Sequence, residues 1–209
     1  MTGRAPIAIV DYGMGNLRSV QKAFEHIGHP ALVTGDPEAV ADAERVVVPG
    51  VGAFGDCLAN LARKGLDEAL RQVVSAGRPY LGICLGLQAL FTTSEEFGPN
   101  DGLNLVPGRV VRFPEGELKV PHIGWNSIET TRPHPVLEGI PDGTHFYFAH
   151  SYFVKPSDPE ATLATTEHGG GFTSAVARGS VVALQFHPEK SQRAGLAVLA
   201  NFAAWSGGA

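Results

Sequence analysis

Residues 80–91 read Tyr80-Leu81-Gly82-Ile83-Cys84-Leu85-Gly86-Leu87-Gln88-Ala89-Leu90-Phe91 and carry the strongest signal in the chain. The stretch opens with apolar residues typical of a buried strand, and Leu87, Leu90 and Phe91 then recur at helical spacing. Glycines stand two residues before and two residues after Cys84, which permits a very tight strand-to-helix turn with the cysteine at its tip. The pattern predicts either a nucleophile elbow or a buried cysteine in an ordinary strand-to-helix unit.

An elbow of this kind would give Cys84 the surroundings of a nucleophile. The helix that follows points its first N–H groups at the cysteine, and these groups favour a thiolate and later an oxyanion. A second motif, far along the chain, decides between the two interpretations.

The overall composition excludes several classes of function. The 209 residues are 44% hydrophobic and carry a net charge of -5, so we expect no nucleic-acid partner and no membrane surface. No apolar stretch reaches the roughly 17–25 residues that a membrane helix needs. Residues 1–6 lead directly into a strand and leave no room for a signal peptide, and two cysteines make no disulfide framework. We therefore expect a cytoplasmic protein with reduced thiols.

The first half of the sequence alternates strand and helix patterns. Apolar runs predict strands at Ile7 to Val10, Ala31 to Thr34, Arg45 to Val48 and Tyr80 to Ile83, with amphipathic segments between them. This alternation predicts an α/β fold of three layers around a mostly parallel sheet, with the site at the carboxyl ends of the strands.

The second half predicts an added antiparallel region. Its strand-like runs are connected by turn-rich segments, and they cover residues 110–113, 145–148, 152–154, 161–165, 172–177 and 181–186. A final helix with Leu196 and Leu199 on one face would pack back on the sheet. The sequence contains no internal repeat and no linker, so residues 1–209 are predicted to form a single domain.

The second motif follows the strand at residues 181–186 and reads His187-Pro188-Glu189. Pro188 biases His187 toward an extended backbone, and in an extended chain His187 and Glu189 point the same way. A carboxylate beside an imidazole fixes its tautomer and supports its charged form. Together with Cys84, this pair predicts a nucleophile, base and orienter. The alternative is a structural histidine, and we assign that role by default to His122, His134, His145, His150 and His168.

An oxyanion needs hydrogen-bond donors. One is expected from the backbone N–H of Leu85, directly after the nucleophile. A second is expected from Val51, because the flanking Gly50 and Gly52 let its peptide approach a ligand and reorient. The alternative is a plain strand-to-helix turn. Cys57 lies on an apolar helical face and is expected in the core.

The order cysteine, histidine, glutamate bears on the class of enzyme. An α/β-hydrolase would place its acid before the histidine, whereas here the acid follows it by two residues. A cysteine-dependent α/β-hydrolase is therefore the less favoured alternative.

These motifs together resemble those of the class I (triad) glutamine amidotransferases. The matching segments are Pro49-Gly50-Val51-Gly52, Gly82 to Gln88 and His187-Pro188-Glu189. Within that class the chain resembles the glutaminase subunits of imidazole glycerol phosphate synthase, from histidine biosynthesis. The segments that carry this second resemblance are residues 11–16, 49–54, 121–126, 147–152 and 189–191.

The resemblance implies the fold of that class and a glutaminase activity. Cys84, His187 and Glu189 would hydrolyse L-glutamine through a thioester, with no cofactor and no metal. Further residues would bind the substrate, namely Gly50, Gly52, Gln88, Ser151 and Tyr152. The ammonia would pass to a separate (β/α)8 cyclase subunit, and the residues expected at that interface are Tyr12, Asn16, Trp125, Tyr147 and Lys190.

Two alternatives remain open on the sequence. One is the glutaminase of vitamin B6 synthesis, which pairs with a pyridoxal phosphate synthase ring instead of a cyclase. The other is a non-catalytic binding module that keeps the fold, although an intact set of Cys84, His187 and Glu189 argues against it.

Overall fold

The structure is a computed structural model that describes residues 5–114 and 119–208. Its α-helices are α1 (Leu17–His26), α2 (Pro37–Asp42), α3 (Phe54–Arg63), α4 (Leu66–Ser75), α5 (Leu85–Gln88) and α6 (Gln192–Ala204). Its short 3-10 helices are η1 (Pro135–Leu137), η2 (Pro159–Ala161) and η3 (Pro188–Lys190). Its strands are β1 (Ile7–Val10), β2 (Ala31–Thr34), β3 (Val46–Gly50), β4 (Tyr80–Cys84), β5 (Phe91–Ser94), β6 (Asn100–Asp101), β7 (Val106–Arg112), β8 (His122–Ser127), β9 (Glu129–Thr130), β10 (His145–His150), β11 (Tyr152–Pro156), β12 (Thr162–Glu167), β13 (Gly171–Arg178) and β14 (Val181–Leu184).

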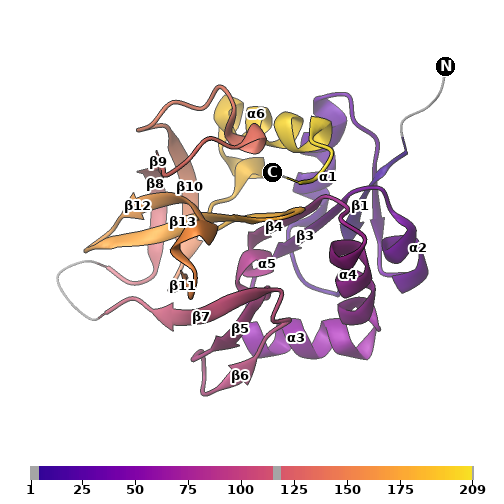
Figure 1. Cartoon of the computed structure of the whole chain (residues 1–209), viewed down its shortest axis with the longest axis horizontal. Helices are drawn as coiled ribbons and strands as arrows, with labels where there is room; N and C mark the ends of the chain where they lie inside the picture. The colour runs from indigo at the N-terminus through magenta and orange to yellow at the C-terminus, as the bar shows by residue number, and fades with distance from the viewer. Residues whose placement is uncertain (1–4, 115–118, 209) are drawn as a thin grey trace.

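Within the described residues, one sheet of 12 strands runs through the molecule (Figure 1), with β2-β1-β3-β4-β14-β13-β11-β7-β5-β6 as its main order. The neighbouring strands from β2 through β14 pair parallel to one another, and the pairing turns antiparallel at β13. Farther along the sheet, β5 and β7 again pair parallel. Strands β12 and β9 extend the antiparallel part, and β8 and β10 form a separate two-stranded sheet. The predicted combination of a mostly parallel sheet with an antiparallel second half is confirmed.

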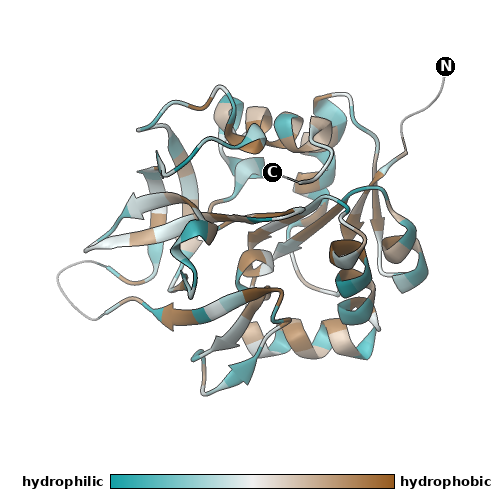
Figure 2. Ribbon diagram, in the orientation of Figure 1, coloured by the Kyte–Doolittle hydropathy of each residue, from teal (hydrophilic) through white to brown (hydrophobic). Residues whose placement is uncertain are grey.

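Helices cover both faces of the parallel part and create two apolar cores. Alternate residues of β1 enter different cores: Ile7 and Ile9 pack with α1 and α6, whereas Ala8 and Val10 pack with α2, α3 and α4. The central strands are hydrophobic along their length, as expected for strands buried on both sides (Figure 2). This is the predicted three-layer arrangement.

Three local predictions differ from the structure. The helix after Cys84 ends at Gln88, and Phe91 instead begins strand β5, so the helical spacing of Leu90 and Phe91 was misleading. Both side chains are buried in the core, and burial of a short apolar run does not by itself distinguish helix from strand. Strands β5, β6, β8 and β9 were not predicted, and strand β3 extends through Gly50 into the expected loop.

Among residues 5–114 and 119–208, no helix combines the length and hydrophobicity needed to span a bilayer.

Candidate active site

Cys84 occupies a strained position at the end of the central strand β4. Its backbone has φ 55° and ψ -108°, a region that residues with a Cβ rarely adopt. The glycines on either side make the turn possible: a Cβ on Gly86 would overlap the carbonyl oxygen of Val48, and one on Gly82 would lie 2.6 Å from the carbonyl oxygen of Gly86. The tight strand-to-helix turn predicted from the sequence, with Cys84 at its tip, is the observed local structure.

The two strands beside β4 bring the other motifs to the same edge of the sheet. Strand β3 pairs with β4 so that Gly50 lies opposite Cys84, and β14 pairs with β4 from the other side. The segment Gln185 to His187 directly follows β14. The loop at Gly50 to Gly52, the cysteine and the histidine therefore meet where three parallel strands end.

His187 and Glu189 form a buried pair. The Nδ1 of His187 lies 3.0 Å from Oε1 of Glu189, and the two side chains are only 3% and 1% exposed. Burial alone would lower the pKa of His187, but its hydrogen bonds and charge interactions with Cys84 and Glu189 raise that pKa to about 10. The imidazolium is thus the favoured form beside the cysteine.

Backbone contacts hold the histidine in place. The N–H of His187 donates to the carbonyl of Tyr147 at 2.9 Å, and the hydroxyl of Ser191 donates to the carbonyl of His187 at 2.6 Å. The same Ser191 oxygen accepts from the N–H of Tyr147 at 3.0 Å. Strand β10 is therefore attached directly to the turn that carries His187.

A cavity of about 360 Å³ opens in front of Cys84. Most of the predicted site residues line it, namely Val51, Gly52, Cys84, Leu85, Gln88, Ser151, Tyr152, His187 and Lys190. Its wall also includes Glu96, which sequence reasoning missed because strand β5 was not predicted. The carboxylate of Glu96 accepts from the N–H of Phe54 at 2.6 Å, which fixes it at the cavity wall.

A chain of hydrogen bonds runs behind the cavity, and one backbone carbonyl determines its direction. The carbonyl of Tyr152 can only accept, so Nδ1 of His150, at 2.8 Å, carries a proton and donates to it. The Nε2 of His150 then accepts from Nδ1 of His122 at 3.1 Å, and Nε2 of His122 accepts from Nδ2 of Asn126 at 3.2 Å. Both histidines are therefore neutral.

Their pKa values agree with that assignment. Burial lowers the pKa of His150 to about 3, and burial with the charge of His168 lowers that of His122 to about 4. These two histidines are structural, as expected by default, yet His150 also lines the cavity. Nothing in the sequence indicates that these two histidines pair, because the pairing depends on the register of β8 against β10.

Two amide side chains continue the same network toward the nucleophile. Nε2 of Gln88 donates to the carbonyl of Tyr152 at 3.0 Å and to Oε1 of Gln185 at 3.2 Å. Nε2 of Gln185 in turn lies 3.7 Å from Sγ of Cys84. Gln88 was predicted as a substrate contact, whereas Gln185 was not singled out.

Two predicted roles are contradicted. Tyr12 was expected at a partner interface, but its side chain is completely buried beneath the loop at Gly50 and cannot meet a partner at the surface. Gly50 was expected to contact substrate, but it is buried and does not line the cavity. Its role is steric: a Cβ there would lie 2.5 Å from the Tyr12 hydroxyl and 2.7 Å from Cβ of Leu85.

The other predicted interface residues lie at or near the surface. Trp125 is 47% exposed and packs edge-on against Tyr147, with ring centroids 6.2 Å apart. The ammonium of Lys190 lies 5.6 Å from the ring centroid of Tyr147. We call these three side chains the Trp125 patch. Asn16 precedes α1 and is half-buried; its side chain accepts from the hydroxyl of Ser19 at 2.8 Å and does not cap the helix backbone.

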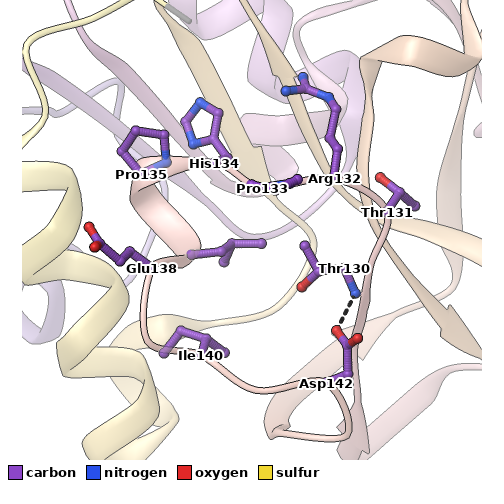
Figure 3. A pocket seen from close by; sticks show the side chains of 10 residues that line it. Thr130, Thr131, Arg132, Pro133, His134, Pro135, Glu138, Ile140 and Asp142 are labelled. Carbon is purple, nitrogen blue, oxygen red and sulfur yellow. Dashed lines mark hydrogen bonds between the residues drawn. The ribbon is translucent and has the colours of Figure 1, made fainter.

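A larger cavity of about 680 Å³ lies elsewhere, lined by the segment of residues 130–142 that includes helix η1 (Figure 3). Its wall includes Arg132, His134 and Glu138, but none of the triad residues. The guanidinium of Arg132 is already bonded to the carbonyls of Glu160 and Ala177. The smaller cavity at Cys84 is therefore the candidate active site.

Comparison with known proteins agrees with this geometry. The family model for glutamine amidotransferase class-I matches residues 8–205. Among solved structures, PurLQS from Thermotoga maritima has a TM-score of 0.76 at 19% identity, covering 96% of this chain and 98% of that one. A glutamine amidotransferase from the same organism has a TM-score of 0.64 at 18% identity, covering 98% and 84%. The chain belongs to the class I glutamine amidotransferases and is thus a glutaminase-type enzyme.

Relatives of higher identity define the family within that class. Imidazole glycerol phosphate synthase subunit HisH of Syntrophotalea carbinolica is 56% identical, over 94% of this chain and 98% of the relative. The HisH subunit of Geobacter metallireducens is 53% identical, over 95% and 98%. At this identity and coverage, the chain is a member of the HisH family, and neither the vitamin B6 alternative nor the α/β-hydrolase alternative is retained.

Proposed function

We propose that the chain hydrolyses L-glutamine to glutamate and ammonia and delivers the ammonia to the (β/α)8 cyclase subunit of imidazole glycerol phosphate synthase, in histidine biosynthesis. The observation that carries the proposal is the meeting of a strained, cavity-facing Cys84 with the buried pair of His187 and Glu189. The names of the HisH relatives, subunits of imidazole glycerol phosphate synthase, support the assembly.

The chemistry proceeds in two stages. In the first, His187 holds the proton of the Cys84 thiol, and the thiolate attacks the side-chain amide carbon of glutamine. The carbon–nitrogen bond then breaks, the nitrogen takes the proton from His187 and leaves as ammonia, and a glutamyl thioester remains. In the second stage, neutral His187 takes a proton from water, the resulting hydroxide attacks the thioester, and the thiolate leaves with glutamate as product.

The negative charge on the oxygen of each tetrahedral intermediate requires donors. The N–H of Leu85 is the first of helix α5 and has no acceptor within that helix. Val51 also lines the cavity, next to Gly52 with φ +101°. The backbone N–H groups of these two residues are the proposed oxyanion donors, and removing one such donor typically costs about 10²–10³-fold in rate.

The cavity walls suit the polar ends of glutamine. The carboxylate of Glu96 provides a negative charge for the α-ammonium group. Gln88 uses its amide N–H groups on Tyr152 and Gln185, so its Oε1 is the atom available to the substrate. The backbone at Ser151 and Tyr152 and the peptide at Gly52 complete the proposed binding site.

The Trp125 patch is the proposed contact surface for the cyclase, together with Asn16. Tyr147 links it to the active site, because its backbone bonds to both His187 and Ser191. Exposed Trp and Tyr side chains are the residues most often found at the energetic centre of interfaces. We place the complex in the cytoplasm.

The proposal is tested by measuring glutamate release from the free chain, then with the cyclase added, and then with the nucleotide substrate of the cyclase added as well. We expect slow turnover by the free chain and strong stimulation by the liganded cyclase, because the Val51 peptide beside Gly52 can reorient. A complex carrying Cys84→Ala should lose glutamine-dependent synthesis and keep synthesis from ammonium salt. Full turnover by the free chain, unchanged by both additions, would contradict the proposed coupling.

A further inference from the structure

The side-chain amide of Gln185 lies between Sγ of Cys84 and the side chain of Gln88. Its Nε2 is 3.7 Å from Sγ of Cys84, and its Oε1 accepts from Gln88 at 3.2 Å. Gln185 is completely buried, it belongs to no part of the triad, and it does not line the cavity. A buried amide held at both ends is therefore in place to act on the cysteine through a hydrogen bond.

The orientation of this amide follows from the backbone. The carbonyl of Tyr152 accepts from one hydrogen of Gln88 Nε2, so the nitrogen of Gln88 must face Tyr152 and Gln185. An N–H that points at Gln185 requires the oxygen of Gln185 in return. The nitrogen of Gln185, with its two hydrogens, is then left facing Sγ of Cys84. A rotation of this amide by 180° would place N–H against N–H and is excluded.

An N–H aimed at sulfur discriminates between its two protonation states. A thiolate accepts hydrogen bonds more strongly than a thiol, and a donor in a buried site cannot be replaced by water. The backbone of Gln185 is also held in place, because its N–H donates to the carbonyl of Ser174 at 2.8 Å. This bond fixes the point from which the side chain that carries the donor extends.

We propose that Gln185 is a positioning residue that stabilises the thiolate of Cys84 and connects it to the substrate contact Gln88. The role of Gln88 in this statement rests on the proposed function, whereas the action on Cys84 does not. Gln88, Gln185 and Cys84 thus form one hydrogen-bonded unit. A shift of Gln88 toward bound glutamine would change its hydrogen bond to Gln185.

The test measures the rate of Cys84 alkylation by iodoacetamide as a function of pH, using the full-length chain. Gln185→Met has a similar shape and no donor, so the midpoint of the pH curve should rise by roughly one unit, which lowers the thiolate fraction about tenfold below the midpoint. The matched control is Ser174→Ala, which removes a buried hydroxyl without a hydrogen-bond partner beside Gln185 and should leave the curve unchanged. Cys84→Ala gives the background from Cys57, which is fully buried.

Several outcomes separate this inference from the proposed function. An unchanged midpoint in Gln185→Met, or an equal rise in Ser174→Ala, would overturn the role of Gln185, whatever the glutaminase activity. A raised midpoint in a chain that never hydrolyses glutamine, even with liganded cyclase, would support the role of Gln185 and reject the proposed function. If Gln185→Met does not fold, as judged by thermal unfolding, Gln185→Leu takes its place and the same criteria apply.

Discussion

His187 and Glu189 are two residues apart and share a hydrogen bond of 3.0 Å that almost no solvent reaches. The bond uses Oε1 of the carboxylate, and Oε2 of Glu189 is buried with no hydrogen-bond partner. A carboxylate with one oxygen unpaired is costly to bury, so the imidazolium of His187 is the group that stabilises it. The pair therefore acts as a unit that fixes the ring and its charge.

Replacing the two members of this pair should have unequal effects on turnover. His187→Ala removes the proton carrier, which typically contributes about 10²–10⁴-fold, whereas Glu189→Gln keeps the hydrogen bond and removes only the charge. Initial rates of glutamate release by the complex with liganded cyclase would show the difference. Equal, near-complete loss in both variants would mean that Glu189 does more than orient the histidine.

The same pair predicts how stability depends on pH. The pKa of His187 is raised from 6.5 to about 10 in the folded chain, so its stabilisation is complete below about pH 6.5 and is lost as the pH rises toward 10. Glu189→Gln removes one cause of that raised pKa. The difference in Tm between the wild-type chain and this variant should thus be larger at pH 6 than at pH 10, as measured by thermal unfolding at both values. A difference that grows with pH would contradict the assigned charge state.

Gly86, the glycine that follows Cys84 in the tight turn, should tolerate no side chain. In Gly86→Ala the new Cβ would overlap the backbone of Val48, which cannot move without disturbing the central strands. Overpacking of this kind costs about 1–3 kcal/mol, occasionally more, so the Tm should fall by several degrees or the chain should fail to fold. The control is Gly171→Ala, where the nearest atom to the new Cβ is 4.0 Å away. Equal stability of the two variants would show that the turn is less tight than described.

The Trp125 patch should contribute to cyclase binding. Trp125→Ala removes a large side chain that is 47% exposed, and loss of an interface Trp costs about 1–2 kcal/mol or more, roughly a 5–30-fold weaker Kd. Leu32→Ala is the control, because Leu32 is 49% exposed on the edge strand β2, away from the patch. Calorimetric titration with the cyclase gives the Kd of each variant. Unchanged affinity in Trp125→Ala would exclude this surface.

The features that could be predicted from the sequence are those determined by residues close together in the chain. Strands β1, β3 and β4 are buried on both faces and read as continuous apolar runs, and the tight turn at Cys84 requires glycine at Gly82 and Gly86. The His187 and Glu189 pair was also predictable, because Pro188 restricts the backbone between them.

Features that depend on distant parts of the chain were not predictable. The short strand β5 carries an apolar residue at Phe91 that also fits a helix, so its state is set by pairing with β7 and β6. Glu96 reaches the cavity only because of that strand. The bond between His122 and His150 exists only in the register of β8 against β10, and the contact of Gln185 with Cys84 joins residues about a hundred positions apart.

The burial of Tyr12 also depends on distant parts of the chain and was not predictable. Tyr12 lies among motif residues near the start of the chain, which suggested an exposed role, but Gly50 lies close to its hydroxyl and the side chain is completely buried. Nothing in the local sequence distinguishes a tyrosine at the surface of a loop from one beneath it.

The central claim is that Cys84 forms the thioester with glutamine, and the most direct test traps that intermediate. The complex with liganded cyclase is mixed with L-glutamine, quenched in acid within one turnover and examined by peptide mass spectrometry. A glutamyl group is expected on the peptide that contains Cys84 and is expected to be absent in Cys84→Ser. Steady glutamine turnover with no adduct on Cys84, or with the adduct on Cys57, would contradict the assignment of the nucleophile.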